Sequence, residues 1–93
     1  MFNQVILVGK VREIYEDHID LGVRIEARNE EERIIPVEMN EEFISHLLLN
    51  NVCGIKGHIE LFEPYTIKDG RDAIKIVCDK LTILDGRGKE NGN

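Results

Sequence analysis

The chain has 93 residues, of which 42% are hydrophobic and 32% are charged, and its formal net charge at pH 7 is −6. This length suits one domain with a small core, and the hydrophobic fraction is too high for a disordered chain. No apolar stretch approaches the roughly 18 residues that cross a bilayer, and no basic segment precedes an apolar one at the N-terminus, so we expect a cytoplasmic protein. The acidic balance argues against a uniformly basic surface for nucleic acid but leaves room for a local cationic face.

The first predicted strand opens with an apolar, β-branched run from Val5 to Val8, closed by Gly9 and flanked by Lys10 and Arg12. A run this short and apolar on both sides predicts a strand that is buried on both faces. Gly9 stands where a barrel strand bends sharply or carries a bulge.

Two further strands follow a polar connection over residues 13–18. Residues 19–28 alternate strictly between apolar and polar side chains, which predicts a half-exposed antiparallel strand. A short turn over residues 29–32 leads into a third strand over residues 33–39. Pro36 within that run cannot donate to a ladder, so it marks an edge or a bulge.

A helix of about ten residues is predicted after the third strand from apolar residues at helical spacing. Asn40 stands at the N-cap position, and two glutamates follow it in the first turn, where acids complement the helix dipole. We expect Asn50 and Asn51 to end the helix. The apolar residues that we expect to face the core are Phe43, Ile44, Leu47 and Leu48.

The rest of the chain predicts two more strands, over residues 52–62 and 73–84, joined by a loop. In the first of them Ile59 and Leu61 are expected to face inward, and Lys56 and Phe62 outward. The loop over residues 63–72 carries Tyr65 and the turn signal Lys68-Asp69-Gly70. We expect residues 1–85 to form the domain and residues 86–93 to be a disordered polar tail. Three strands, a helix and two strands is the order of the all-β, five-stranded OB-fold, a Greek-key barrel with its helix between strands three and four.

The pattern of reactive side chains argues against an enzyme. Cys53 and Cys78 lie inside apolar runs without metal-ligand spacing, so we expect buried thiols in a reducing compartment. The histidines are widely separated, Gly54 and Gly57 precede no helix, and nothing resembles a nucleophile with its base. We therefore expect no catalytic site, no metal, no cofactor and no small-molecule substrate.

Four segments, taken in order, resemble the bacterial single-stranded DNA-binding protein family and together span residues 2–85. They are residues 3–11, 34–49, 51–59 and 65–84. The resemblance implies a non-catalytic OB-fold that coats single-stranded DNA, without reading its sequence, in replication, repair or recombination. It also implies a homo-oligomer, a dimer or the usual tetramer. Pairing through the first strand would bury its second apolar face, so the candidate interface residues are Phe2, Gln4, Ile6 and Val8.

The chain departs from this family where bases usually stack. The turn over residues 29–32 replaces a long aromatic hairpin, Arg33 and Met39 stand where the third strand commonly carries aromatics, and the chain has no tryptophan. The acidic, phenylalanine-ending tail that recruits partners in this family is missing, so recruitment through such a tail is not expected.

Proteins bind single-stranded DNA without reading its sequence through cations that contact the phosphates and aromatic side chains on which the bases stack. We therefore predict the binding residues from these two types of side chain. Arg24, Arg28 and Arg33 are expected close together, either contacting phosphates or forming cross-strand pairs with Glu26 and Glu38. The candidate nucleic-acid-binding residues are Lys10, Arg24, Arg28, Arg33, Lys56, Phe62, Tyr65 and Arg71.

Two other classes of protein fit the same pattern. An acidic OB-fold without an aromatic hairpin also suits an adaptor that docks on a replication assembly and binds little or no DNA. A third class is a simple oligomerisation domain. A contiguous basic groove favours DNA binding, acids scattered over the second and third strands favour the adaptor, and a large apolar contact without a groove favours the oligomerisation domain.

Overall fold

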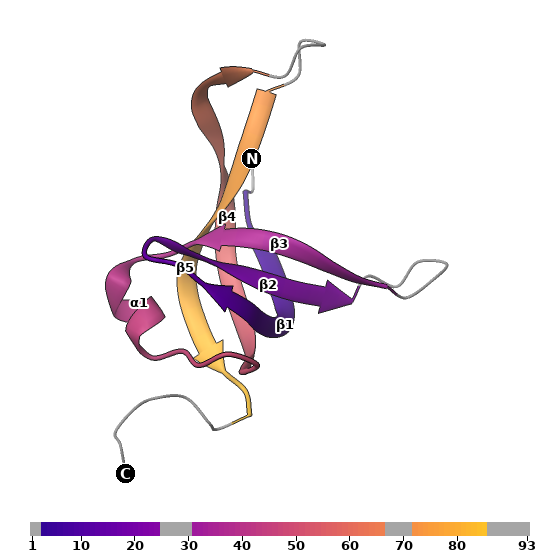
Figure 1. The fold of residues 1–93 in the computed structure, drawn as a ribbon. Helices are drawn as coiled ribbons and strands as arrows, with labels where there is room; N and C mark the ends of the chain where they lie inside the picture. The colour runs from indigo at the N-terminus through magenta and orange to yellow at the C-terminus, as the bar shows by residue number, and fades with distance from the viewer. Residues whose placement is uncertain (1–2, 25–30, 67–71, 86–93) are drawn as a thin grey trace.

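The secondary structure follows the predicted order of three strands, one helix and two strands (Figure 1). The computed structural model describes residues 3–24, 31–66 and 72–85, and for residues 62–66 and 72–73 the backbone alone. The elements are β1 (Val5–Ile14), β2 (His18–Arg24), β3 (Glu32–Glu38), α1 (Glu41–Ser45), β4 (Val52–Thr66) and β5 (Asp72–Ile83). Residues 25–28 of the second predicted strand, the turn signal at Lys68-Asp69-Gly70 and the tail over residues 86–93 lie outside the described residues.

The strands close into a barrel in the order β1-β2-β3-β5-β4. β1 connects β4 to β2 in the barrel, because its first half, Val5 to Lys10, pairs with β4 and its second half, Lys10 to Ile14, pairs with β2. All neighbouring strands are antiparallel except β3 and β5, which are parallel. The predicted five-stranded OB-fold, with its helix between β3 and β4, is confirmed.

Pro36 lies on an edge of β3, as predicted. It is opposite Asp20 on the β2 side, whereas the described pairing with β5 begins one residue later, at Val37. Proline, which has no backbone N–H, is tolerated there because the described pairing of β3 with β5 begins only at Val37, so no hydrogen-bond donor is needed on that side.

The core is built from the inward-facing residues of the strands and the residues around α1. Ile19 and Leu21 of β2 have no exposed surface, which confirms the predicted alternation. The two cysteines are buried free thiols, as expected, and burial raises the pKa of both. The buried apolar residues are Val11, Ile19, Leu21, Val37, Met39, Leu47, Cys53, Ile55 and Cys78.

Gly9 serves a close contact between strands rather than a bulge. The register of β1 shifts between Val11 and Glu13, so of the two alternatives predicted at Gly9, a sharp bend or a bulge, the bulge is wrong. A Cβ at Gly9 would collide with the carbonyl oxygen of Gly22 in β2. Glycine is therefore required at this point because the two backbones approach more closely than a side chain permits.

The prediction that β1 is buried on both faces is wrong for the single chain. Ile6 is 69% exposed and Val8 is 55% exposed, while Leu7 between them packs against the core. The cause is that the outward side of β1 has no second layer over it among the described residues. Gln4 is exposed as well, and Phe2 lies outside the described residues.

α1 is five residues long, half the predicted length. Its start is as predicted, because Oδ1 of Asn40 accepts a hydrogen bond from the Phe43 N–H at 2.8 Å. Phe43 and Ile44 are partly buried and pack against the core, and Leu47 is 2% exposed. Leu48 was expected in the core but is 41% exposed, because the chain has left the helix before it.

A turn held by two asparagines replaces the second half of the predicted helix. Asn50 has φ of 71°, a left-handed conformation that Asn tolerates better than most residues. Oδ1 of Asn51 accepts a hydrogen bond from the Leu48 N–H at 2.7 Å. These contacts turn the chain back toward β4, so the helix ends early.

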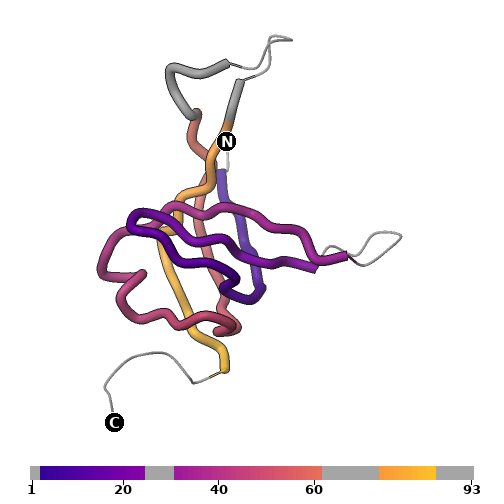
Figure 2. The backbone as a smooth tube through the Cα atoms, viewed as in Figure 1, coloured from indigo at the N-terminus to yellow at the C-terminus, as the bar shows by residue number. Residues whose placement is uncertain are grey.

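β4 and β5 form a long hairpin that projects beyond the barrel (Figures 1 and 2). β4 continues to Thr66, which pairs with Asp72, so Tyr65 belongs to a strand and the predicted loop is shorter than expected. Ile59 and Leu61 were expected to face the core, yet they are 36% and 52% exposed. Ile59 lies at the rim of the barrel, opposite Ile76, and Leu61 lies beyond it on the projecting hairpin, so neither is enclosed by the core.

Candidate nucleic-acid interface

A group of cations lies on the outer face of the barrel, which we call the cationic face. Residues opposite one another in antiparallel strands share a face. Lys10 is opposite Gly22, Arg24 is opposite Glu32, and Lys56 is opposite both Ile6 and Lys80. The cationic face comprises Lys10, Arg12, Arg24, Lys56 and Lys80, together with the carboxylate of Glu32.

Two open hollows in this face share one wall. The first, of about 250 Å³, is lined by Lys10, Arg12, Arg24 and Glu32 among others. The second, of about 350 Å³, is lined by Ile6, Gly54, Lys56, Lys80, Thr82 and Leu84 among others. Val8 lines both hollows, so the cations at the two ends of the face belong to one continuous surface.

A bidentate ion pair crosses the first hollow. Nε of Arg12 donates to Oε2 of Glu32 at 2.7 Å, and Nη2 of Arg12 donates to Oε1 at 2.8 Å. The remaining amino group of Arg12 donates to Oδ1 of Asn50 at 2.9 Å. The bridge runs from β1 to β3 above Gly22 of β2, where a Cβ would collide with the Glu32 carboxylate. Gly22 thus lets a β3 side chain reach across β2 to β1.

The Glu32 carboxylate is affected by all three cations that line the first hollow. The hydrogen bond from Arg12 lowers the pKa of Glu32, and the charges of Arg12, Arg24 and Lys10 lower it further. In return the same hydrogen bond raises the pKa of Arg12. The hollow therefore favours a negative charge at the position of this carboxylate.

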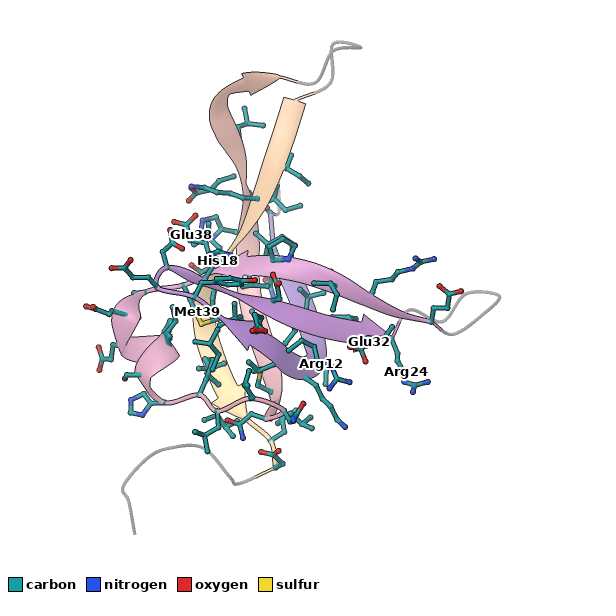
Figure 3. The ribbon with its side chains drawn as sticks, in the orientation of Figure 1. Arg12, His18, Arg24, Glu32, Glu38 and Met39 are labelled. Atoms are coloured by element: carbon teal, nitrogen blue, oxygen red, sulfur yellow. The ribbon has the colours of Figure 1, made fainter. Side chains whose placement is uncertain are left out.

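Acidic side chains lie at the other end of β2 and β3. Figure 3 shows Arg12, Arg24 and Glu32 together at one end of these strands and His18 and Glu38 at the other. His18 is opposite Glu38, and Asp20 lies two residues along β2 on the same face. Nδ1 of His18 lies 2.7 Å from Oδ1 of Asp17, a hydrogen bond that lowers the pKa of that aspartate.

The structure separates two of the arginines that the sequence places together. Arg33 is opposite Val23, whereas Arg24 is opposite Glu32, so Arg33 and Arg24 lie on opposite faces of the β2–β3 hairpin. The predicted cluster is therefore wrong for Arg33, whose side chain instead lies 3.5 Å from Glu31. The predicted cross-strand pairing of Glu38 with an arginine is also wrong, because Nζ of Lys75 lies 2.9 Å from Glu38.

The other predicted binding residues divide into two groups. Lys10, Arg24 and Lys56 lie on the cationic face. Arg28 and Arg71 lie outside the described residues, as does Glu26, and for Phe62 and Tyr65 only the backbone of β4 is described.

Sequence reasoning missed three members of the cationic face, namely Arg12, Lys80 and Glu32. Arg12 had a signal, because it is two residues from Lys10 and so shares its side of a strand. The sequence contained a similar signal for Lys80, because Thr82 and Leu84 follow it at every second position and so share its side of the strand. Glu32 had none, because its role depends on a side chain crossing a neighbouring strand.

The closed barrel and its helix between β3 and β4 place this protein in the class of OB-fold proteins. Two solved structures are similar to it over nearly their whole length. The dimeric N-terminal domain of PriB from Thermoanaerobacter tencongensis superposes with a TM-score of 0.67 at 16% identity, covering 88% of this chain and 96% of that one. The mitochondrial single-stranded DNA-binding protein Rim1 of S. cerevisiae superposes with a TM-score of 0.56 at 14% identity, covering 90% and 95%.

At these identities the similarity establishes the fold, which is the fold implied by the resemblance in the sequence. No protein-family model matches the sequence, and no curated protein matches it either. No helix within the described ranges is long and apolar enough to span a membrane.

Proposed function

We propose that this protein binds single-stranded DNA without reading its sequence, as a non-catalytic protein of DNA replication, repair or recombination in the cytoplasm. The observation that carries the proposal is the cationic face, which gathers Lys10, Arg12, Arg24, Lys56 and Lys80 in a chain whose net charge is −6. The fold of Rim1, which is named as a single-stranded DNA-binding protein, supports it.

In the proposed complex the phosphates follow the cationic face past Lys10 and Arg24, and Lys56 contacts them from the rim of the β1 interface proposed below. Phe62 and Tyr65 of β4 supply stacking surfaces for bases, and Arg28 and Arg71 add phosphate contacts at the edges of the path. Arg33 is left out of this path because it lies on the opposite face of the β2–β3 hairpin.

The test is fluorescence polarisation of a labelled oligo-dT of about 35 nucleotides, titrated with protein at about 20 mM and about 200 mM salt. Replacing both Lys10 and Arg24 by Gln removes two phosphate contacts and reduces the slope of log K against log salt by about 1.4. Phe62→Ala and Tyr65→Ala each weaken binding by about 1–3 kcal/mol if the rings stack on bases. Lys75→Gln is the matched control, because Lys75 is bonded to Glu38 away from the cationic face.

A second candidate function rests on a different observation. Asp17, Asp20 and Glu38 lie around one end of β2 and β3, the surface on which acids favour an adaptor that docks on a basic partner of a replication assembly. Absence of oligo-dT binding at low salt and tens of micromolar protein would reject DNA binding and leave this adaptor as the function to test.

We also propose that the protein forms a homo-oligomer through β1, with Phe2, Gln4, Ile6 and Val8 at the interface. The exposure of Ile6 and Val8 supports this, and so does Leu84, which is 53% exposed and lines the same hollow. Pairing at this end of β1 covers the second hollow, so Lys56 and Lys80 lie at the rim of the interface, and it leaves Lys10, Arg12 and Arg24 of the first hollow open to DNA.

Sedimentation velocity tests the interface. The wild-type protein is expected to sediment as a dimer or tetramer, and Ile6→Glu as a monomer, because a carboxylate cannot be buried there without a partner. Leu49→Glu is the control, because Leu49 is 55% exposed and lies next to Asn50, which is bonded to Val11 in the second half of β1, outside the proposed interface. Equal effects of the two substitutions would contradict the proposed interface.

A further inference from the structure

Glu32 binds the cationic face in the way that a phosphate group would. Its two oxygens accept parallel hydrogen bonds from Nε and Nη2 of Arg12 at 2.7 Å and 2.8 Å. This fork-to-fork geometry is the one in which arginine recognises both carboxylates and phosphates. The carboxylate is also the only acidic side chain among the described residues that line the first hollow.

The two other cations of the hollow have no closer acidic partner. Lys10 and Arg24 form no ion pair with any described residue, and both are exposed. Their charges act on the Glu32 carboxylate, and all four side chains line the same hollow. One carboxylate thus faces three cations, and the hollow retains an excess of positive charge.

We propose that Lys10, Arg12 and Arg24 form a phosphate-binding site that Glu32 occupies in the free protein, and that a phosphodiester of single-stranded DNA displaces the Glu32 carboxylate from Arg12. This proposal rests on the proposed function and specifies one contact within it. Glu32 acts as an internal competitor, so that the site binds a phosphate more weakly than its three cations alone would.

The exchange requires no change in the barrel. Glu32 is the first residue of β3, and its side chain is 28% exposed, so the carboxylate can rotate into solvent while the β2–β3 ladder stays in place. Arg12 keeps a bidentate acceptor throughout, because the phosphate takes the position of the carboxylate, and its bond to Asn50 is unaffected. The hollow is open, so the phosphate reaches this position directly from solvent.

Removing the competitor tests the proposal. Glu32→Gln is expected to tighten oligo-dT binding about three- to fivefold and to increase the slope of log K against log salt by about 0.7, the value for one more phosphate contact. Glu38→Gln is the matched control, because it removes the same charge from the same face of the same strand but from the end bonded to Lys75. It is expected to change affinity less than twofold, as a charge remote from the bound phosphate.

A double-mutant cycle shows whether the gain acts through Arg12. In an Arg12→Gln background, Glu32→Gln is expected to have no more effect than Glu38→Gln, because the bidentate donor that the phosphate would gain is absent. Thermal unfolding of each variant confirms that it is folded. Equal effects of Glu32→Gln and Glu38→Gln, or a gain that persists without Arg12, would overturn the proposal while leaving DNA binding itself intact.

A second readout separates this proposal from the proposed function. The Nε–H of Arg12 is observed by NMR while inorganic tripolyphosphate is added to wild type and to Glu32→Gln. A shift of that signal which saturates at lower tripolyphosphate concentration in Glu32→Gln supports the phosphate site even if no variant binds oligo-dT, in which case only the proposed function fails. An unmoved Arg12 signal in both proteins overturns the site.

Discussion

Asn51 directly precedes β4 and is expected to contribute more to stability than the other polar side chains of the described turn between α1 and β4. It is 2% exposed, its Oδ1 accepts from the Leu48 N–H at 2.7 Å, and its Nδ2 donates to Asp85 at 3.3 Å. Asn51→Ala leaves the Leu48 N–H without its acceptor, which costs about 1–3 kcal/mol. For a domain of this size, a loss of about 2 kcal/mol lowers Tm by about 8–16 °C.

Urea unfolding followed by circular dichroism measures this effect, with Asn40→Ala as the reference. Asn40 also accepts one backbone N–H, at the exposed start of α1, and its loss is expected to cost about 1 kcal/mol. If Asn51→Ala destabilises the protein less than Asn40→Ala does, the reasoning from burial is refuted. Asn51→Asp adds a second test, because it places a carboxylate beside Asp85 and should lose more stability at about pH 7 than at about pH 4.

Three further predictions concern other parts of the barrel. Gly9→Ala should lower Tm more than Gly54→Ala, because the new Cβ collides with the backbone carbonyl of Gly22 at Gly9 but meets only a side-chain carbon at 3.8 Å at Gly54. Hydrogen bonds to two carboxylates raise the pKa of His58 above its ordinary 6.5. The stability that His58 contributes is therefore complete below about pH 6.5 and lost as pH rises through the raised value, so Tm should fall over this range in wild type and less in His58→Gln. Burial raises the pKa of Cys53 to about 11, so Ellman's reagent at about pH 8 should label it only after urea is added.

The strands were predictable where one face of the chain is buried and the other is not. In β2 the alternation of Ile19 and Leu21 with polar residues fixed both the element and the side that enters the core. The length of α1 was not predictable in the same way, because Leu47 and Leu48 continue a helical pattern. The early end depends on the side chain of Asn51 and the left-handed backbone of Asn50, and both act through contacts that sequence periodicity does not contain.

The candidate site shows a second limit, which is register. The sequence places Arg24 and Arg33 near one turn, and their proximity along the hairpin suggested a shared face. β3 begins at Glu32 and pairs it with Arg24, which puts Arg33 opposite Val23. A difference of one residue in register moves every side chain of a strand to the other face, and turn length sets the register. A single sequence does not determine that length to within one residue.

The net charge of −6 and a role in binding DNA are compatible because the charges of the chain are segregated. At about 0.1 M ionic strength the Debye length is about 10 Å, so a phosphate at the first hollow responds to Lys10, Arg12 and Arg24 rather than to the whole chain. Asp20 and Glu38 lie at the opposite end of β2 and β3 and affect only charged groups that approach that end. Glu32 is the exception, because it lies within the hollow itself and opposes the phosphate directly. In the proposed complex the strength of DNA binding therefore depends less on the net charge than on whether the Glu32 carboxylate stays bonded to Arg12 or is displaced by a phosphate.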